Sequence, residues 1–412
     1  MFVIGASANV GETGLFIKES DAITIDTVSD ITVNRITEDG NIDAENSPTD
    51  QTQSNIISLG DVDITANTDN ISVNYISSQG NITLTAISGS ILETSDDTTD
   101  DIKATGLITL TATGDISAPD TYDDMYLDFA DQSAVVAFST EKGNIHLRGE
   151  GTLFLNDIDT TNGKIDSIAN DQIQAKDIVS GGENISIHNL SGDILIGSMT
   201  SAGQVVIISD QGSIIDSTED NQSDITAGTN EIFLTAANHI TGTNNTSLEL
   251  ANNSIVKAHT TTEGTIHLTG TGALTLKNVS ATGSIEINAA NDIIAENVVN
   301  SDIGDNALHD IAITSTSGSI EAFVISSINN VNLNAGQAII NKAGLITAND
   351  ATLKAVTGIG TSTDFINLDI NRLDAANQST NGIYVNNTKA LTLSDLDNDS
   401  RAIVNQSDAD II

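Results

Sequence analysis

The chain repeats itself at two lengths, and this double repetition limits the folds that it can adopt. The stretch GNIHLRGEGTLFLNDIDTTNG (Gly143–Gly163) returns as GTIHLTGTGALTLKNVSATG (Gly264–Gly283), with aliphatic residues, a histidine and glycines in corresponding places. GSILETSDDTTDDIKATG, from Gly89, matches GSIIDSTEDNQSDITAG, from Gly212. These pairs define a long repeat of about 120 residues, and a fixed internal period is typical of repeat architectures. We place the copies roughly at residues 1–61 (partial), 62–183, 184–310 and 311–412 (partial).

A shorter repeat lies inside the long one. Asn144, Lys164, Asn184 and Gln204 follow one another at steps of 20 residues, and each opens a run in which apolar and polar residues alternate. Such alternation is the signature of a β-strand. One coil of about 20 residues would stack on the next at about 4.8 Å. We therefore predict an all-β fold, a right-handed parallel β-helix (β-solenoid) with about 20 residues per coil, continuous over residues 1–412. Longer steps, such as ETSDDTTDDIKATG, predict acidic loop insertions.

The alternation also predicts which side chains point inward. Ile145 and Leu147 would face the core, as would Ile266 and Leu268 in the matching stretch. The histidines between them, His146 and His267, would then face solvent on an exposed strand. We expect both histidines to be chemically inert.

The charge of the chain limits its partners. Lys and Arg number 14 against 57 Asp and Glu, and the net charge is −43. Nucleic acid and anionic membrane surfaces are excluded as partners because they require clustered basic residues. No run is long enough for membrane insertion. A strongly acidic surface instead favours divalent cations, and calcium is the one cofactor that we consider.

The stretch GIGTSTDFINLDINRLDAANQSTNGIYVNNTKALTL (Gly358–Leu393), together with GNITLTAISGSI (Gly80–Ile91), resembles the repeats of filamentous haemagglutinin-like proteins of bacteria. These are large β-solenoid exoproteins and adhesins. The resemblance extends over essentially the whole chain and implies a shaft, because nothing resembles the family's secretion domain or a wall anchor. It implies an extracellular or cell-surface location. MFVIGASANVG at the start lacks the features of a signal peptide, so we expect the export signal to be absent from this chain.

The sequence does not favour an enzyme. Carboxylates crowd into the inserted loops without a distinctive pair, and the chain has no Trp and only four Tyr to stack on sugar rings. No serine-nucleophile motif, phosphate-binding loop or zinc pattern is present. We predict no catalytic and no cofactor-binding residues. The alternative is a carbohydrate-active β-helix enzyme or a carbohydrate-binding module, which would gather carboxylates and an aromatic residue in a surface cleft.

One short motif points to calcium. DLDNDS places Asp395, Asp397 and Asp399 at alternate positions, as in the start of loops that wrap a hard cation with carboxylate oxygens. Gln406 stands where an EF-hand would have its bidentate Glu, so the motif is not an EF-hand. The alternative is a solvated acidic turn. A second candidate is TSDDTTDD, with the carboxylates of Asp96, Asp97, Asp100 and Asp101.

These observations favour a structural or adhesive shaft of an extracellular fibre or cell-surface exoprotein. The residues from Gly14 continue the pattern of those from Gly382. We therefore expect end-to-end self-association into filaments or continuation of a longer array, with a capped monomer as the alternative. A surface receptor or a glycan is the further partner that we expect. A soluble binding module that uses the acidic loops is a third hypothesis.

Overall fold

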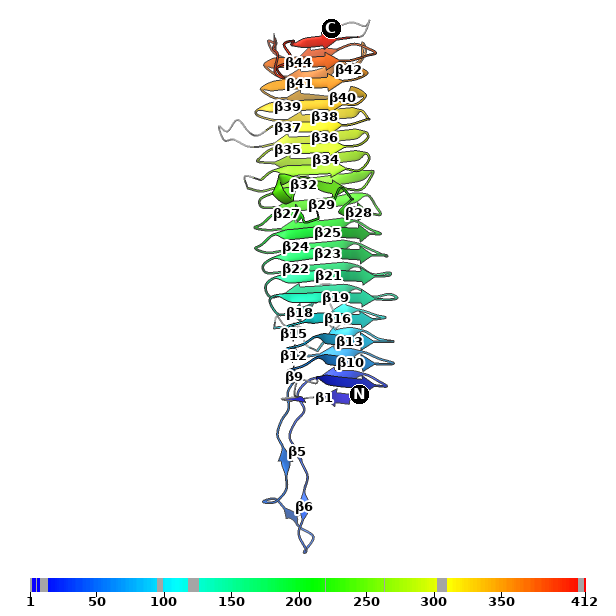
Figure 1. The fold of residues 1–412 in the computed structure, drawn as a ribbon, viewed down its shortest axis with the longest axis vertical. Helices are drawn as coiled ribbons and strands as arrows, with labels where there is room; N and C mark the ends of the chain where they lie inside the picture. Colours follow the sequence, from blue (N-terminus) through cyan, green and yellow to red (C-terminus); the bar gives the residue numbers. More distant parts are fainter. Residues whose placement is uncertain are drawn as a thin grey trace. The chain divides into compact units, whose positions relative to one another are not determined.

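The computed structural model describes residues 2–4, 6–7, 14–94, 99–117, 126–218, 220–262, 264–301, 310–406 and 411–412. It forms two compact units. Unit 1 comprises Met1–Asp171 with Asp177–Glu183, and unit 2 comprises Gln172–Lys176 with Asn184–Ile412. In each unit the strands of two parallel sheets alternate along the chain (Figure 1). The predicted all-β parallel β-solenoid is thereby confirmed.

The two sheets of unit 1 are called 1a and 1b. Sheet 1a contains β3 (Leu15–Glu19), β10 (Val62–Ala66), β13 (Ile82–Ala86), β16 (Leu107–Ala112), β19 (Ser133–Ser139) and β21 (Leu153–Thr160). Sheet 1b contains β1 (Phe2–Ile4), β2 (Ala6–Ser7), β4 (Ile23–Ile25), β9 (Ile56–Ser58), β11 (Ile71–Val73), β12 (Ile76–Ser78), β14 (Ile91–Glu93), β15 (Ile102–Ala104), β17 (Ile116–Ser117), β18 (Leu127–Phe129), β20 (Ile145–Gly149) and β22 (Ile165–Ala169). Residues of β23 (Ile173–Ser180) are divided between the units.

The two sheets of unit 2 are called 2a and 2b. Sheet 2a contains β24 (Ile185–Asn189), β26 (Val205–Ser209), β29 (Glu231–Ala236), β32 (Ser254–Thr260), β34 (Leu274–Ala281), β36 (Ile293–Asn300), β38 (Ile320–Ser326), β40 (Ala338–Thr347), β42 (Gly358–Ile359), β43 (Ile366–Asp369) and β45 (Val385–Asn387). Sheet 2b contains β25 (Ile194–Ser201), β27 (Ile214–Asp216), β28 (Ile225–Ala227), β30 (Ile240–Gly242), β31 (Leu248–Leu250), β33 (Ile266–Gly270), β35 (Ile285–Ala289), β37 (Ile311–Ser315), β39 (Asn330–Ala335), β41 (Asp350–Ala355), β44 (Arg372–Asn377), β46 (Thr392–Leu393) and β47 (Ile403–Asn405).

Aliphatic ladders form the core. In the regular coils a residue pairs with the one 20 positions later, as Val62 does with Ile82. Ile64 stacks on Leu84 in the same way, and Leu84 stacks on Leu110, which lies 26 positions later because a longer loop intervenes. All three side chains are fully buried. Burial of each such side chain contributes about 1.5–3 kcal/mol to folding. The ladders therefore hold successive coils in one register.

Polar side chains at the start of the strands form a second ladder. The backbone N–H of Lys164 donates to Oδ1 of Asn144 (3.1 Å), one coil earlier, and the N–H of Gln204 donates to Oδ1 of Asn184 (2.9 Å). In the same way, the N–H of Ser213 donates to Oδ1 of Asp193 (2.7 Å). These bonds satisfy amide groups that lie just outside the strand pairing. They explain why Asn144, Asn184 and Asp193 each stand directly before a strand.

Glycine is required where the corners of successive coils approach one another. The Thr160 hydroxyl donates to the carbonyl of Gly143 (2.6 Å), and the N–H of Gly163 donates back to the Thr160 oxygen (3.0 Å). A Cβ atom added at Gly163 would lie 2.0 Å from the Gly143 carbonyl oxygen. A side chain at this position would therefore force the coils apart.

One antiparallel extension leaves unit 1 between β4 and β9. In this arm (residues 28–53), β5 (Ile31–Thr32) pairs with β8 (Thr49–Asp50), and β6 (Arg35–Ile36) pairs with β7 (Ile42–Asp43). Four large aliphatic side chains of the arm are more than half exposed: Ile31, Val33, Ile36 and Ile42. The arm was not predicted from the sequence.

Among the described residues the one helix is η1 (Thr243–Asn245), a 3₁₀ turn, and no helix there has the length and hydrophobicity needed to cross a bilayer.

The two matching histidines are buried, so the prediction that they are exposed was wrong. Their neighbours Ile145 and Leu147 do point into the core, as the alternation predicts. His146 is nevertheless only 6% exposed because Tyr126 lies over the strand, with ring centroids 6.0 Å apart. His267 is 7% exposed, and its Nδ1 lies 3.3 Å from the Asn245 carbonyl oxygen in η1. Inserted segments therefore cover an outer face that a regular coil would leave open.

Candidate metal centre

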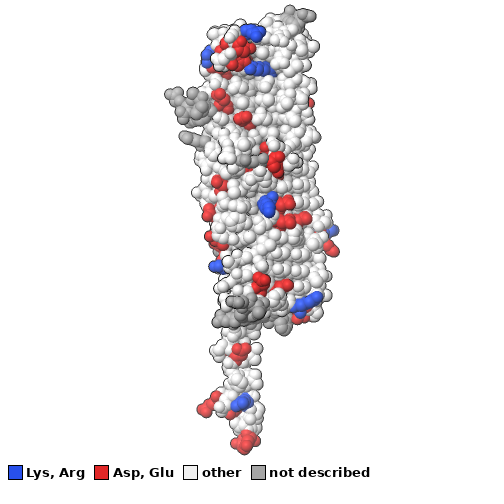
Figure 2. Space-filling view, viewed as in Figure 1, with Lys and Arg blue, Asp and Glu red and all other residues white. Residues whose placement is uncertain are grey.

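Acidic side chains are distributed along the face of the molecule seen in Figure 2, with few basic ones between them. Within the described residues, three groups bring three carboxylates together, with one oxygen of each within 4.8 Å of the others. We call them the first cluster (Glu93, Asp101, Asp128), the second cluster (Asp216, Asp224, Glu249) and the third cluster (Asp374, Asp395, Asp397). Most of these side chains are buried, which distinguishes them from ordinary surface acids.

The first and second clusters occupy corresponding places in two copies of the long repeat. In each cluster one acid ends a strand, one immediately precedes the next strand after an inserted loop, and one lies in the middle of a strand one coil further on. The corresponding pairs are Glu93 with Asp216, Asp101 with Asp224, and Asp128 with Glu249. The loop lets chain segments that are distant in sequence present carboxylates to one another.

The backbone geometry of the two clusters is also the same. In the first, the N–H of Asp128 donates to Oδ2 of Asp101 (2.9 Å), while the N–H of Asp101 donates to the Asp128 carbonyl (3.0 Å). In the second, the N–H of Glu249 donates to Oδ2 of Asp224 (2.7 Å), and the N–H of Asp224 donates to the Glu249 carbonyl (2.9 Å). Each bond to a carboxylate fixes its direction, so the oxygens are oriented before any cation arrives.

The first cluster contains a basic side chain of the protein. Arg148 of β20 lies beside Asp128 in the sheet register and forms an ion pair with its carboxylate. Burial opposes the charged form of Arg148, but Asp128 and Glu93 together hold the pKa of the guanidinium above its ordinary value. A fixed cation therefore already neutralises part of the first cluster.

The second cluster has a neutral residue at the same place. Thr269 of β33 is the register partner of Glu249, as Arg148 is of Asp128. Burial, together with the charges of Asp216 and Glu249, raises the pKa of Asp224 to about 8, although the backbone N–H of Glu249 opposes the change. Burial likewise raises the pKa of Glu249, with Asp216 and Asp220 adding to the effect. Full ionisation of the second cluster therefore has a free-energy cost that a bound cation would relieve.

Donors at the edge of the second cluster fix the orientation of Asp216. The N–H and the hydroxyl of Thr218 both donate to Oδ1 of Asp216, at 2.7 and 2.8 Å. Carboxylate oxygens of this kind are the ligands that calcium prefers, and they can bind it in a monodentate or bidentate manner. The arrangement can therefore hold a hard divalent cation.

The third cluster includes two of the three residues predicted from the sequence. Asp395 and Asp397 come together with Asp374 of β44, whereas Asp399 is not part of the group. The N–H of Asp399 instead donates to Oδ1 of Asp395 (3.1 Å) and of Asp397 (3.0 Å). Asp399 therefore helps to shape the turn, and calcium binding by Asp395, Asp397 and Asp399 stays a prediction.

A lysine neutralises part of the third cluster. Lys354 Nζ lies 2.6 Å from Oδ2 of Asp397, and this contact lowers the pKa of that carboxyl. Burial raises the pKa of Asp374, although the N–H groups of Leu396 and Asp397 donate to its Oδ2 at 2.8 and 3.2 Å and oppose the change. The third cluster, like the first, already includes a basic side chain.

The second acidic motif of the sequence contributes one cluster member. Asp101 belongs to the first cluster, and Asp100 lies beside it with a pKa that burial raises and Lys103 lowers. Asp96 and Asp97 lie outside the described residues. Sequence reasoning missed Glu93, Asp128 and the whole second cluster. The signal was available. Glu93 and Asp101 align with two acids of the second cluster when the stretches from Gly89 and Gly212 are compared. Asp128 aligns with Glu249 when the stretches from Leu127 and Leu248 are compared.

Comparison with models of protein families gave no match, and comparisons with curated protein sequences and with solved structures gave none either.

Proposed function

We propose that this chain is a structural or adhesive shaft of an extracellular fibre or cell-surface exoprotein, and that calcium stabilises it by binding at the second cluster. The calcium site is supported by a three-carboxylate cluster that occurs once in each of two copies of the long repeat. One copy has Arg148 beside the cluster, and the other has Thr269 at the same place. The resemblance to filamentous haemagglutinin-like proteins supports the shaft.

Electrostatics favour a divalent ion at the second cluster. Three carboxylates whose oxygens lie within 4.8 Å of one another repel strongly when all are ionised, and burial removes the water that would screen them. A calcium ion would neutralise two charges at once and would tie β27 and β28, which an inserted loop separates, to β31 in the next coil. Calcium sites of extracellular modules have Kd values of about 10⁻⁴–10⁻³ M, which matches a site of this simplicity.

The test of the calcium site is a titration. The full chain, stripped with EDTA and dialysed, is titrated with CaCl₂ in a calorimeter and melted with and without calcium. At a calcium concentration 100 times the Kd, the free energy of unfolding should rise by about 2.7 kcal/mol. Asp224→Asn should abolish this gain, whereas Glu286→Gln, which removes an exposed carboxylate from β35, should retain it. Equal melting temperatures of the unmodified chain in EDTA and in calcium would contradict the proposal.

The proposal that the chain is an extracellular shaft is tested by locating the protein. Antibodies against the whole chain, applied to intact cells that produce it, should label the cell surface or extracellular fibres in electron micrographs. Labelling that appears only after the cells are permeabilised would contradict this function and leave the calcium site untouched.

A further inference from the structure

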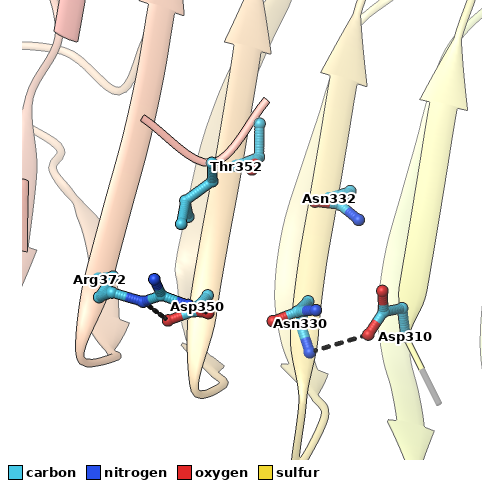
Figure 3. A pocket seen from close by; sticks show the side chains of 7 residues that line it. Asp310, Asn330, Asn332, Asp350, Thr352 and Arg372 are labelled. Atoms are coloured by element: carbon cyan, nitrogen blue, oxygen red, sulfur yellow. Dashed lines mark hydrogen bonds and ion pairs between the residues drawn. The ribbon is translucent and has the colours of Figure 1, made fainter. Parts of the chain in front are cut away.

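A polar cavity of about 280 Å³ opens on the outer face of sheet 2b (Figure 3). Its walls come from the adjacent strands β39, β41 and β44, from the residue that precedes β37, and from the turn that follows β46. Six polar side chains line it: Asp310, Asn330, Asn332, Asp350, Thr352 and Arg372. Leu396 is the apolar member of the lining.

The sheet register arranges these polar groups in rows. Asn330, Asp350 and Arg372 are consecutive register partners, and Asp310 immediately precedes β37 in the same row. Asn332 and Thr352 are partners in the next outward-facing row. Parallel strands lie about 4.8 Å apart, so the rows present hydrogen-bonding groups at regular intervals across the cavity.

Hydrogen bonds fix the walls of the cavity. Nε of Arg372 donates to Oδ1 of Asp350 (2.8 Å), and Nη2 of Arg372 donates to Oδ2, so the pair is bidentate. Arg372 remains 48% exposed, which leaves part of its guanidinium edge for a ligand. The N–H of Leu396 donates to Oδ2 of Asp374 (2.8 Å), and this bond anchors the turn against the sheet. The site is therefore formed before a ligand enters.

We propose that this cavity binds a neutral saccharide. Carboxylate oxygens of Asp310 and Asp350 can accept hydroxyl protons, the amides of the two asparagines can both donate and accept, and Arg372 can donate to a hydroxyl or ring oxygen. Two carboxylates against one guanidinium disfavour an acidic sugar. Leu396 offers an apolar contact to the C–H face of a sugar ring. This inference is independent of the calcium proposal, because its site and its measurement are separate.

The experiment is a glycan array followed by calorimetry. The labelled full chain is applied to neutral mono-, di- and trisaccharides of glucose, galactose, mannose and N-acetylglucosamine, and the strongest binder is titrated in solution. Asn332→Ala should weaken its binding about tenfold, the loss expected for one hydrogen bond of about 1.4 kcal/mol. Asp350→Asn, which weakens the hold on Arg372, should also weaken it.

The matched control is Asn334→Ala, because Asn334 lies two residues further along β39, on the same face but outside the cavity lining. It should bind like the unmodified chain. The proposal is wrong if no neutral saccharide binds, if only acidic sugars bind, or if Asn332→Ala and Asn334→Ala bind with equal affinity.

Discussion

Arg148 and Thr269 occupy the same position in two copies of the long repeat, each beside a carboxylate on the neighbouring strand. Arg148 forms an ion pair with Asp128, whereas Thr269 places a hydroxyl-bearing side chain next to Glu249. The surrounding backbone hydrogen bonds are the same in both copies. One repeat thus neutralises part of its acidic cluster with a guanidinium, whereas the other has a threonine at that position, where our proposal assigns the same role to a calcium ion.

Exchanging these two residues should exchange the calcium dependence of the clusters. Thr269→Arg should raise the melting temperature in EDTA and remove most of the gain from calcium, because a guanidinium would replace the ion. Arg148→Thr should lower stability by about 3–5 kcal/mol in EDTA, since it leaves the buried Asp128 carboxylate uncompensated. Calcium should restore much of that loss. Scanning calorimetry of both variants, with and without calcium, measures these effects.

The control for this exchange is Thr275→Arg, which adds the same charge on β34 in sheet 2a, away from the second cluster in sheet 2b. It should leave the gain from calcium unchanged. If Thr275→Arg and Thr269→Arg reduce the calcium effect equally, general charge neutralisation explains the result and the site assignment is wrong.

Without calcium, stability should fall as pH rises from about 4 to about 8. The pKa of Asp224 is raised from an ordinary value of 3.8 to about 8, chiefly by burial. In this window the unfolded chain has lost the Asp224 proton and the folded chain still binds it, so each increase in pH favours unfolding. Asp224→Asn should flatten this part of the profile. Urea unfolding in EDTA at pH 5, 6, 7 and 8 tests the difference between the two chains.

Calcium should reverse the effect of pH at the second cluster. The ion binds ionised carboxylates and must displace the Asp224 proton, so its apparent affinity should increase between pH 6 and pH 8. Titrations in buffers of different ionisation enthalpy report the number of protons released. An affinity that is constant across this pH range would argue that the ion binds elsewhere.

One of the hydrogen bonds between the starts of successive strands uses an unusual side chain. At His239 the acceptor is an imidazole nitrogen, because the N–H of Thr265 donates to Nδ1 (3.2 Å). The acceptor in the equivalent bonds of Asn144, Asn184 and Asp193 is a side-chain oxygen. His239→Asn should therefore preserve stability, and His239→Ala should lower it by about 0.5–1.5 kcal/mol, the usual cost of one lost hydrogen bond. Urea unfolding at pH 8 measures both. An alanine variant as stable as the asparagine variant would show that this hydrogen bond contributes nothing to the free energy of unfolding.

The regular coils could be predicted because their signals are local. Asn144 and Lys164 are one sequence period apart, and the strands that follow them pair with the same offset in the sheet. The alternation within each run determines which side chains face the core. Alternation gives the direction of His146 but not what covers it. Burial of that ring depends on Tyr126, which an inserted segment places over the strand.

The acidic clusters could not be derived from spacing alone. Glu93 and Asp128 become neighbours only after two coils have stacked and a loop has closed, so no short motif contains them. The motif that was recognised, at Asp395 and Asp397, is a cluster in which Lys354 already pairs with a carboxylate. Position-by-position comparison of the two long repeats is the step that would have revealed the buried acids.

The arm, finally, should be dispensable for the stability of the solenoid. Its four large aliphatic side chains are more than half exposed, its strands are two residues long, and a two-stranded hairpin alone is at best marginally stable. Replacing residues 30–51 by a short Gly-Ser linker should leave the melting temperature unchanged, because the paired residues Val28 and Gln53 remain to close the loop. Leu84→Ala serves as the positive control and should cost about 2–5 kcal/mol, since it removes a fully buried side chain from the core ladder. If the deletion lowers the melting temperature as much as Leu84→Ala does, the arm is part of the folded core and its exposed aliphatic residues need another explanation.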